Sequence, residues 1–268
     1  MATPKIEKPR GVLNLEAGQK KFQLSMYLPV PKLVLFVEHY WIVRWDLRDE
    51  EPYVQQNLPH PTVHLVFERG HSRIVGLMHG KFSQRLEGQG CVFGIKFRPG
   101  GFYPFLKSPL SAFTDKSLPI ESVFPVHSTV LENTILSKES DEDMVEVAEG
   151  FLRQHMPARD QNLTLITDMM NFIVSNHDVT RVEDIADRFG IARRTLQRLF
   201  SQYVGIGPKW VIRRYRLHEA AEQLAAHNPV DLPTLALNLG YFDEAHFNKD
   251  FKMYVGSTPG AYAKNSSK

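Results

Sequence analysis

The feature that most constrains how this chain folds is an internal repeat in its C-terminal part. A pattern of four apolar positions closed by a glycine occupies residues 182–190 and returns at residues 232–240, 50 residues further along. A second pattern, Phe-x-x-Tyr-Val-Gly-x-x-Pro, occupies residues 200–208 and returns at residues 251–259. Apolar residues at helix spacing, a glycine turn and a second apolar stripe predict a helix-turn-helix unit in each copy.

Between the two copies, residues Pro208 to Ala226 are predicted to form one long helix. The proline stands near the first turn, where its missing N–H costs no hydrogen bond. At a rise of 1.5 Å per residue this helix is about 28 Å long. Two recognition helices held about one turn of B-DNA apart, near 34 Å, can enter successive major grooves on one face of the duplex. Two helical hairpins that only pack together are the structural alternative.

The first half of the chain has a different period. Short apolar runs are broken by Pro, Gly and Asn, and the later runs alternate between apolar and polar residues. Alternation with turn residues in between predicts β-strands of a sandwich or barrel. The runs are residues 33–37, 40–45, 62–68 and 91–98.

Helical periodicity returns after a Pro- and Ser-rich connection at residues 107–127. Residues 128–136 and 141–155 are predicted to be helices, the second with an apolar stripe, and residues 156–160 are the candidate linker. The predicted fold class is α+β: a β-rich N-terminal domain, a helical linker, and an all-α C-terminal domain with two helix-turn-helix motifs joined by a long helix.

The distribution of charge matters more than the net charge of +2. Residues 192–218 contain seven cations and no acidic residue. Because charge interactions are screened beyond about 10 Å, such a local block can attract phosphates even when the whole chain is nearly neutral. A solvated helix face is the alternative interpretation. The cations are Arg193, Arg194, Arg198, Lys209, Arg213, Arg214 and Arg216.

Other sequence features exclude several classes of protein. Cys91 is the only cysteine, which excludes an internal disulfide and a cysteine-cluster metal site. The polar N-terminus has no apolar core of a signal peptide, and no run of 18 apolar residues predicts a membrane span. Phosphate-binding loops and the nucleophile elbow are missing from the sequence. We therefore expect a cytoplasmic, nucleoid-associated protein.

Residues from about 163 to 264 resemble the DNA-binding domain of the AraC/XylS family of transcriptional regulators. Ala192 departs from the family pattern, which commonly has a capping Ser there, and Lys249 replaces a frequent Arg. The N-terminal half is similar to uncharacterised domains that precede this motif in some members, chiefly through residues 93–101. The C-terminal resemblance rests on Ile185-Ala186, Arg194-x-Leu196-x-Arg198-x-Phe200, Gly205-x-x-Pro208, Arg216, Ala220, Leu224, Gly240-Tyr241-x-Asp243, His246-Phe247-x-Lys249-x-Phe251 and Gly256-x-Thr258-Pro259-x-x-Tyr262.

The predicted DNA-reading residues lie opposite the apolar stripes of the two recognition helices. In the first helix this face presents Arg194, Gln197, Arg198 and Ser201, with Arg193 beside it. In the second helix it presents Glu244, Ala245, His246 and Lys249, while Asp243 is predicted to be the N-cap. The resemblance implies base contacts from the same faces. On the connecting helix, Lys209, Arg213 and Arg214 are expected to contact phosphates or solvent.

Two kinds of ligand site are conceivable in the β-rich half. His60, His64, Glu68, His71 and His79 are close in sequence and could hold a metal, although no His-x-His pair exists and no metal site is predicted. Aromatic residues could instead line an apolar small-molecule pocket, with ordinary core packing as the alternative for each of them. The candidate pocket residues are Tyr40, Trp41, Trp45, His64, Phe102 and Tyr103.

Together these features predict a sequence-specific DNA-binding transcription regulator that responds to a small-molecule effector, with no catalytic residues and no cofactor. The alternative is a metal- or carboxylate-dependent enzyme of the β-barrel type with a helical appendage. Expected partners are operator or promoter DNA, the effector, a second copy of the chain, and RNA polymerase if the protein is an activator; no membrane is involved. The expected division is a disordered tail (1–10), a β-rich sensor (11–127), a helical linker with a dimerisation role (128–160) and the DNA-binding domain (161–268).

Overall fold

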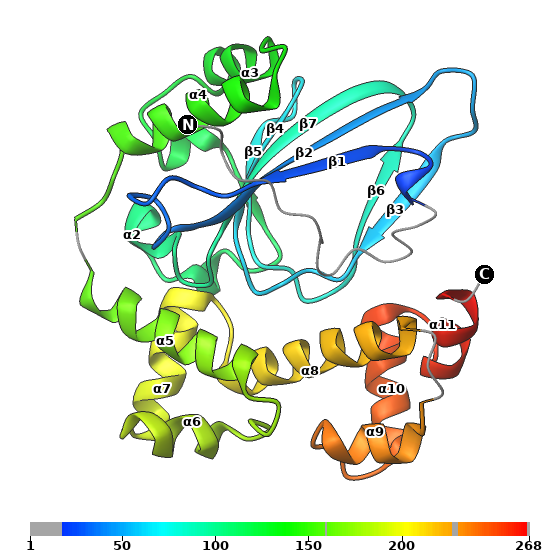
Figure 1. Ribbon diagram of the computed structural model, residues 1–268. Helices are drawn as coiled ribbons and strands as arrows, with labels where there is room; N and C mark the ends of the chain where they lie inside the picture. The colour runs from blue at the N-terminus through cyan, green and yellow to red at the C-terminus, as the bar shows by residue number, and fades with distance from the viewer. Residues whose placement is uncertain (1–17, 159, 227–229, 267–268) are drawn as a thin grey trace.

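The computed structural model describes residues 18–158, 160–226 and 230–266, so the tail expected at residues 1–10 lies outside the described residues. A β-rich part comprises the first half of the chain, and a helical part lies along one side of it (Figure 1). None of the helices in these ranges is both long and apolar enough to cross a membrane.

The β-rich part contains an antiparallel six-stranded sheet with the strand order β1-β2-β7-β4-β5-β8. A separate pair, β3-β6, forms a second, two-stranded sheet. The strands are β1 (Gln23–Tyr27), β2 (Val37–Leu47), β3 (Tyr53–Asn57), β4 (His64–Glu68), β5 (Arg73–Val75), β6 (Phe82–Leu86), β7 (Gly88–Phe97) and β8 (Ser117–Leu118).

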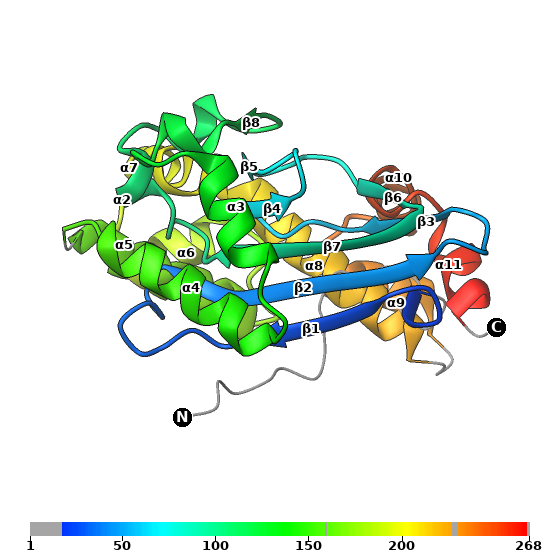
Figure 2. The ribbon, with the colours of Figure 1, turned by 90° about the horizontal axis from the view of Figure 1, so that it is seen from above.

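One face of the large sheet is covered by helices α3 (Ser128–Leu136) and α4 (Asp141–Gln154), as Figure 2 shows. Successive strand residues point to opposite faces, so Leu65, Phe67 and their cross-strand neighbours Phe93 and Ile95 share this buried side. The two helices match the predicted ranges closely. The apolar stripe of α4 is buried in this same core rather than left for a second subunit. The stripe of α4 therefore offers no apolar surface for the expected dimerisation role of residues 128–160.

The prediction of a strand at residues 33–37 is wrong. Residues 31–36 form turns, and the amides of Phe36 and Val37 both donate to the carbonyl of Leu33. This turn buries Leu33 and Phe36 three residues apart, whereas an extended strand would place them on opposite faces. The predicted connection at 107–127 follows the short helix α2 (Tyr103–Leu106). It contains β8 and the 3₁₀ turns η1 (Leu110–Ala112) and η2 (Ile120–Ser122).

The helical part consists of two helix-turn-helix units, as the repeat predicts. The repeated glycine adopts the left-handed conformation in both units, with φ of 61° at Gly190 and 80° at Gly240. The helices are α5 (Gln161–Ser175), α6 (Val182–Phe189), α7 (Arg193–Leu199) with its π-helical continuation η3 (Phe200–Val204), α8 (Pro208–Ala225), α9 (Leu232–Asn238), α10 (Glu244–Val255) and α11 (Pro259–Ser266).

Helix α8 joins the two units and belongs to both of their cores. Val211 and Ile212, near its start, pack with α5, α6 and α7, whereas Leu217 and Leu224 pack with α9 and α10. The helix runs along the underside of the β-rich part, with one unit at each end (Figure 1). The position of each recognition helix therefore depends on how α8 is held.

Candidate nucleic-acid interface

Helix α7 exposes the reading face that the sequence predicts. Leu196 and Leu199 are buried, and Arg194, Gln197 and Arg198 are exposed on the opposite side. Ala192 caps the helix without a side-chain hydrogen bond, as expected for a residue with no acceptor.

The cations of this face are not equivalent. The Arg193 guanidinium lies 2.7 Å from Glu183 Oε1, and since both side chains are largely exposed the pair is weak and easily exchanged. Within the described part of the chain, Arg194 and Arg198 form no ion pair. Ser201 follows in η3 and is half-buried. The two arginines with no carboxylate partner lie where an anionic surface would meet α7.

Helix α10 presents the second predicted face. The side chain of Asp243 accepts a hydrogen bond of 2.7 Å from the His246 amide, which confirms the predicted N-cap. Ala245, His246 and Lys249 are exposed. Glu244 is half-buried and accepts a hydrogen bond from the Asn248 amide group at 3.1 Å, so its carboxylate has a partner within the helix.

The expectation that Arg214 contacts phosphate or solvent is wrong. Its side chain is 1% exposed, and the guanidinium lies 4.6 Å and 4.7 Å from the ring centres of Trp210 and Tyr254. Arg214 Nη2 donates to the His79 carbonyl of the β-rich part at 2.5 Å. Burial lowers the pKa of Arg214 to about 10, which leaves it charged at neutral pH. This arginine stabilises the contact between the two parts of the chain.

Arg216, another member of the cation block, is also buried. It donates to the Ile173 carbonyl of α5 and pairs with Glu219 at 2.8 Å. The block of seven cations is therefore divided between surface and interior. Successive residues of a helix point about 100° apart. Cations that are consecutive in the sequence therefore face different sides of the helix, and those on packed sides are buried.

Arg213 is expected to contact phosphate, but in the structure it pairs with Asp250 of α10 at 3.2 Å. Asp250 is 5% exposed, and its carboxylate also lies 3.8 Å from His246 Nε2. The pair connects the second recognition helix to α8. The sequence contains a signal for this pair: Asp250 occupies a position of the buried stripe between Phe247 and Phe251, and a buried carboxylate requires a cation or hydrogen-bond donors.

The β-rich part contains a partly open cavity of about 230 Å³, lined by residues of the large sheet and of the β3-β6 pair. Of the predicted pocket residues, Trp41, Trp45 and His64 line it. Trp41 Nε1 donates to His64 Nδ1 at 3.1 Å, and Thr62 Oγ1 lies 3.2 Å from His64 Nε2. Burial lowers the pKa of His64 to about 3, with Lys96 and His39 adding to the effect, so the imidazole is neutral at pH 7.

The structure does not place the other three predicted pocket residues at this cavity. Tyr40 faces the opposite side of the sheet, beneath α4, where burial and then Glu149 raise its pKa. Phe102 is buried in the core of the sheet and α4, 4.9 Å from the ring of Phe97. Tyr103 lies between the two parts of the chain, 4.1 Å from the ring of Tyr203. Alternation along β2 already separates Tyr40 from its neighbour Trp41.

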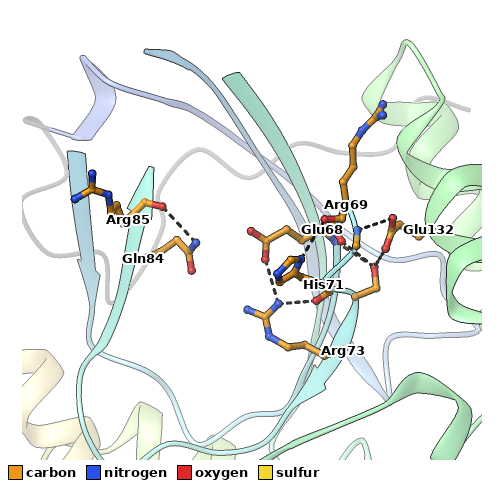
Figure 3. Close-up of polar contacts among 9 residues, drawn as sticks. Glu68, Arg69, His71, Arg73, Gln84, Arg85 and Glu132 are labelled. Carbon is orange, nitrogen blue, oxygen red and sulfur yellow. Dashed lines mark hydrogen bonds and ion pairs between the residues drawn. The ribbon is translucent and has the colours of Figure 1, made fainter. Parts of the chain in front are cut away.

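Polar side chains from facing strands also line the cavity (Figure 3). Glu68 pairs with Arg73 at 3.1 Å, and Arg73 donates to the His71 carbonyl at 2.6 Å. Gln84, on the facing strand β6, also lines the cavity. His79 is not among the residues that line the cavity and pairs with Asp115 at 2.6 Å. Over residues 18–158, 160–226 and 230–266, no three His, Cys, Asp or Glu side chains come together in a way that could hold a metal ion.

Comparisons with known proteins agree with this architecture. Residues 185–265 match the model of a helix-turn-helix domain, and residues 25–119 match a domain of unknown function, DUF6597. An uncharacterised HTH-type transcriptional regulator of Haemophilus influenzae is 30% identical over 107 residues, 40% of this chain and 36% of that protein. The HTH-type transcriptional activator AarP of Providencia stuartii is 32% identical over 100 residues, 37% of this chain and 73% of AarP.

Among solved structures, an AraC-type regulator from Chromobacterium violaceum is 24% identical over 39% of this chain and 97% of that chain, with a TM-score of 0.34. ToxT from Vibrio cholerae is 13% identical over 91% of this chain and 98% of ToxT, with a TM-score of 0.43.

The chain spans about a third of the length of the first curated relatives it matches, between 27% and 36%. The relatives described above are named as transcription regulators, in agreement with the non-enzymatic interpretation of the sequence. With a duplicated helix-turn-helix part that matches AarP over most of that activator's length, this chain belongs to the AraC/XylS family of DNA-binding transcription regulators.

Proposed function

We propose that this regulator recognises a specific duplex sequence with α7 and α10 in successive major grooves, and that its β-rich part senses a small molecule. The observation that carries the first half is the exposed face of α7, where Arg194, Gln197 and Arg198 stand together with no acidic residue between them. The observation that carries the second half is the cavity between the two sheets.

The proposed base contacts follow from the donors and acceptors of each face. Arg194 and Arg198 can each make two hydrogen bonds to guanine O6 and N7, and Gln197 can do the same with adenine. On α10, Glu244 can accept from cytosine N4, and the methyl group of Ala245 can contact that of thymine. His246, Lys249 and Ser201 complete the proposed reading surface.

The proposed phosphate contacts are Arg193, which exchanges Glu183 for DNA, and the exposed Lys209 at the start of α8. Arg213 is proposed to hold α10 in place through Asp250 instead. One chain already carries two readers, so the proposed binding unit is a single chain; dimerisation has no support from the buried stripe of α4. Residues 161–268 form the proposed DNA-binding domain. The proposed location is the cytoplasmic nucleoid, with RNA polymerase as a further partner if the protein activates transcription.

We expect the first unit to contribute more affinity than the second. The α7 face carries two arginines that form no ion pair with the described residues, whereas Lys249 on α10 lies on a helix that begins with Asp243 and Glu244, and exposed carboxylates oppose an approaching polyanion. The second unit should therefore determine site choice more than binding strength.

The experiment is selection of genomic fragments by the purified full chain, followed by titration of the selected site at fixed salt. Two matched double variants separate the units, Arg194→Ala/Arg198→Ala and His246→Ala/Lys249→Ala. The proposal predicts an enriched sequence, and a larger loss of affinity for the first variant. Failure to enrich any sequence overturns specific recognition, and a larger loss for the second variant overturns the ranking.

A further inference from the structure

We infer that the cavity binds an uncharged, flat and largely apolar molecule, and that binding is transmitted to both DNA readers because two segments of the cavity wall are also the seat of α8. This inference rests on the proposed sensing function and specifies the ligand class and the route of regulation. Three observations carry it: the indole floor of the cavity, the pairing of its charged groups, and the shared wall.

The floor of the cavity consists of two indole rings lying on strand β7. A Cβ atom at Gly94 would come within 2.0 Å of the Trp41 ring, and one at Gly90 within 2.2 Å of the Trp45 ring. Only glycine allows each indole to lie this close to the strand. Both indole N–H groups have partners, His64 for Trp41 and the Glu87 carbonyl for Trp45. A ligand therefore meets apolar ring surface here rather than free donors, which suits a flat ring.

The remaining walls are mostly apolar, with side chains from both sheets. They include Met26, Val43, Val66, Phe82 and Leu86. At about 230 Å³ the cavity suits a compact molecule rather than a long chain.

The acidic and basic side chains of the cavity wall form ion pairs. Lys96 pairs with Glu38 at 2.9 Å, and Arg73 pairs with Glu68 at 3.1 Å. Burial lowers the pKa of His39 to about 4, so this imidazole is neutral at pH 7, like His64. A ligand ion would have to displace one of these pairs, which is unfavourable above all for Lys96, because its side chain is buried. The site is therefore matched to an uncharged molecule.

The first shared segment of the wall connects β3 to β4. Leu58 and His60 both line the cavity. Leu58 is also buried in the core of the second helix-turn-helix unit, together with Leu217 of α8. The His60 ring stacks on His218 of α8, with ring centres 4.1 Å apart and planes within 5°. A ligand that displaces this segment displaces a contact of the second unit.

The second shared segment follows β5. Gly76 and Met78 line the cavity, and Leu77 between them is buried in the core of the first unit. The next residue, His79, accepts the hydrogen bond from Arg214 of α8. Alternate residues of one segment thus contact the cavity and the first unit. Both helix-turn-helix units therefore contact segments that a bound molecule would also contact. Occupancy of the cavity changes the position of α8 and of the two recognition helices attached to it.

The three tryptophans allow a direct test, because two line the cavity and Trp210 lies at the seat of α8, 5.7 Å from the His79 ring. The full chain is labelled with 5-fluorotryptophan, and the three ¹⁹F resonances are assigned with single Trp→Phe variants. Methyl benzoate is the probe, and benzoate is its charged counterpart of similar size. We expect methyl benzoate to shift all three resonances and to change the affinity for the selected DNA site about fivefold or more. Benzoate should do neither at the same concentration.

A filled-cavity variant tests the transmission without any ligand. Val92→Phe adds a ring inside the cavity, and Val130→Phe makes the same change on the exposed surface of α3. We expect the Trp210 resonance to move in the first variant and not in the second. If Val92→Phe does not fold, the titration of the parent chain still decides.

The outcomes separate the two proposals. Shifts of Trp41 and Trp45 with an unmoved Trp210 overturn the transmission and leave sensing intact. Equal binding of benzoate overturns the uncharged ligand class. No shift with methyl benzoate refutes sensing of this ligand class, whatever Val92→Phe shows, while recognition of DNA is judged separately by the selected site.

Discussion

Replacement of Arg213 by alanine distinguishes two roles for one arginine. The guanidinium lies 3.2 Å from Asp250, and the two side chains are 30% and 6% exposed. If the ion pair is the main role, Arg213→Ala leaves a buried carboxylate on α10 without its cation. If phosphate contact is the main role, the same change removes one attraction to DNA and leaves α10 undisturbed.

The magnitude follows from the burial of the pair. Removing one partner of a fully buried ion pair costs about 3–5 kcal/mol. Because Arg213 is partly exposed, solvent screens the interaction, and we expect about 1–2 kcal/mol. The loss should appear in the stability of the second unit and, through a misplaced α10, as a roughly 5- to 30-fold weaker binding of the selected site. Rejection of the wrong sequences should weaken at the positions read by α10.

The assay is a double-mutant cycle in the full chain with Arg213→Ala, Asp250→Asn and the double variant. Urea unfolding and DNA titrations at several salt concentrations are measured for each protein. Asp250→Asn removes the charge that needs a partner, so Arg213→Ala should cost less than about 0.5 kcal/mol in that background. The salt dependence of DNA binding should be the same for parent and Arg213→Ala.

A different pattern would refute this reasoning. If the two substitutions are additive and the slope of binding against salt falls by about one unit in Arg213→Ala, the arginine contacts a phosphate. The ion pair with Asp250 would then have no measurable part in holding α10.

Three further changes test other parts of the molecule. Arg198→Ala should relax base preference and cost about 1–3 kcal/mol on the selected site, and an unchanged selected sequence would contradict its groove position. The fold should lose stability as the pH falls from about 6.5 to about 4, because the unfolded chain binds a proton on His39 that the folded chain excludes. The free energy of unfolding in urea should fall over that range by at most about 1.4 kcal/mol per pH unit for this residue. His39→Gln should make the profile less steep, and His64, whose pKa is lowered in the same direction, should account for part of the remaining slope. Gly94→Ala should displace the Trp41 ring, lower stability by about 1–3 kcal/mol and alter tryptophan fluorescence, while Gly80→Ala, with open space around its Cα, should do neither.

Local periodicity determines much of the helical part. The 50-residue repeat predicts both helix-turn-helix units, and the long connecting helix is found at Pro208–Ala225, one residue shorter than predicted. The N-cap at Asp243 and the left-handed turn at Gly190 were also predictable, since each depends on a few neighbouring residues. The exposed face of α7 follows in the same way from the position of its leucines.

Other features depend on elements far apart in the chain. Whether Arg213, Arg214 and Arg216 reach solvent is decided by what packs around α8, and that includes a carbonyl of the β-rich part and an aspartate of α10. From the sequence alone, the apolar stripe of α4 cannot be distinguished from an exposed apolar face. The structure shows that the large sheet covers it. The turn that buries both Leu33 and Phe36 likewise depends on packing against elements far away in the chain.

The sequence by itself determined the repeat, the helices that it encodes, the alternating strands and the residues on the exposed polar face of α7, because these follow from side-chain spacing within one element. Only the tertiary structure decided which face of β2 borders the cavity, which cations are buried, and that the segments at 58–60 and 76–79 contact both the cavity and α8. The physical reason is that burial and ion pairing are properties of surfaces brought together from distant elements, and spacing along one element carries no information about its neighbour.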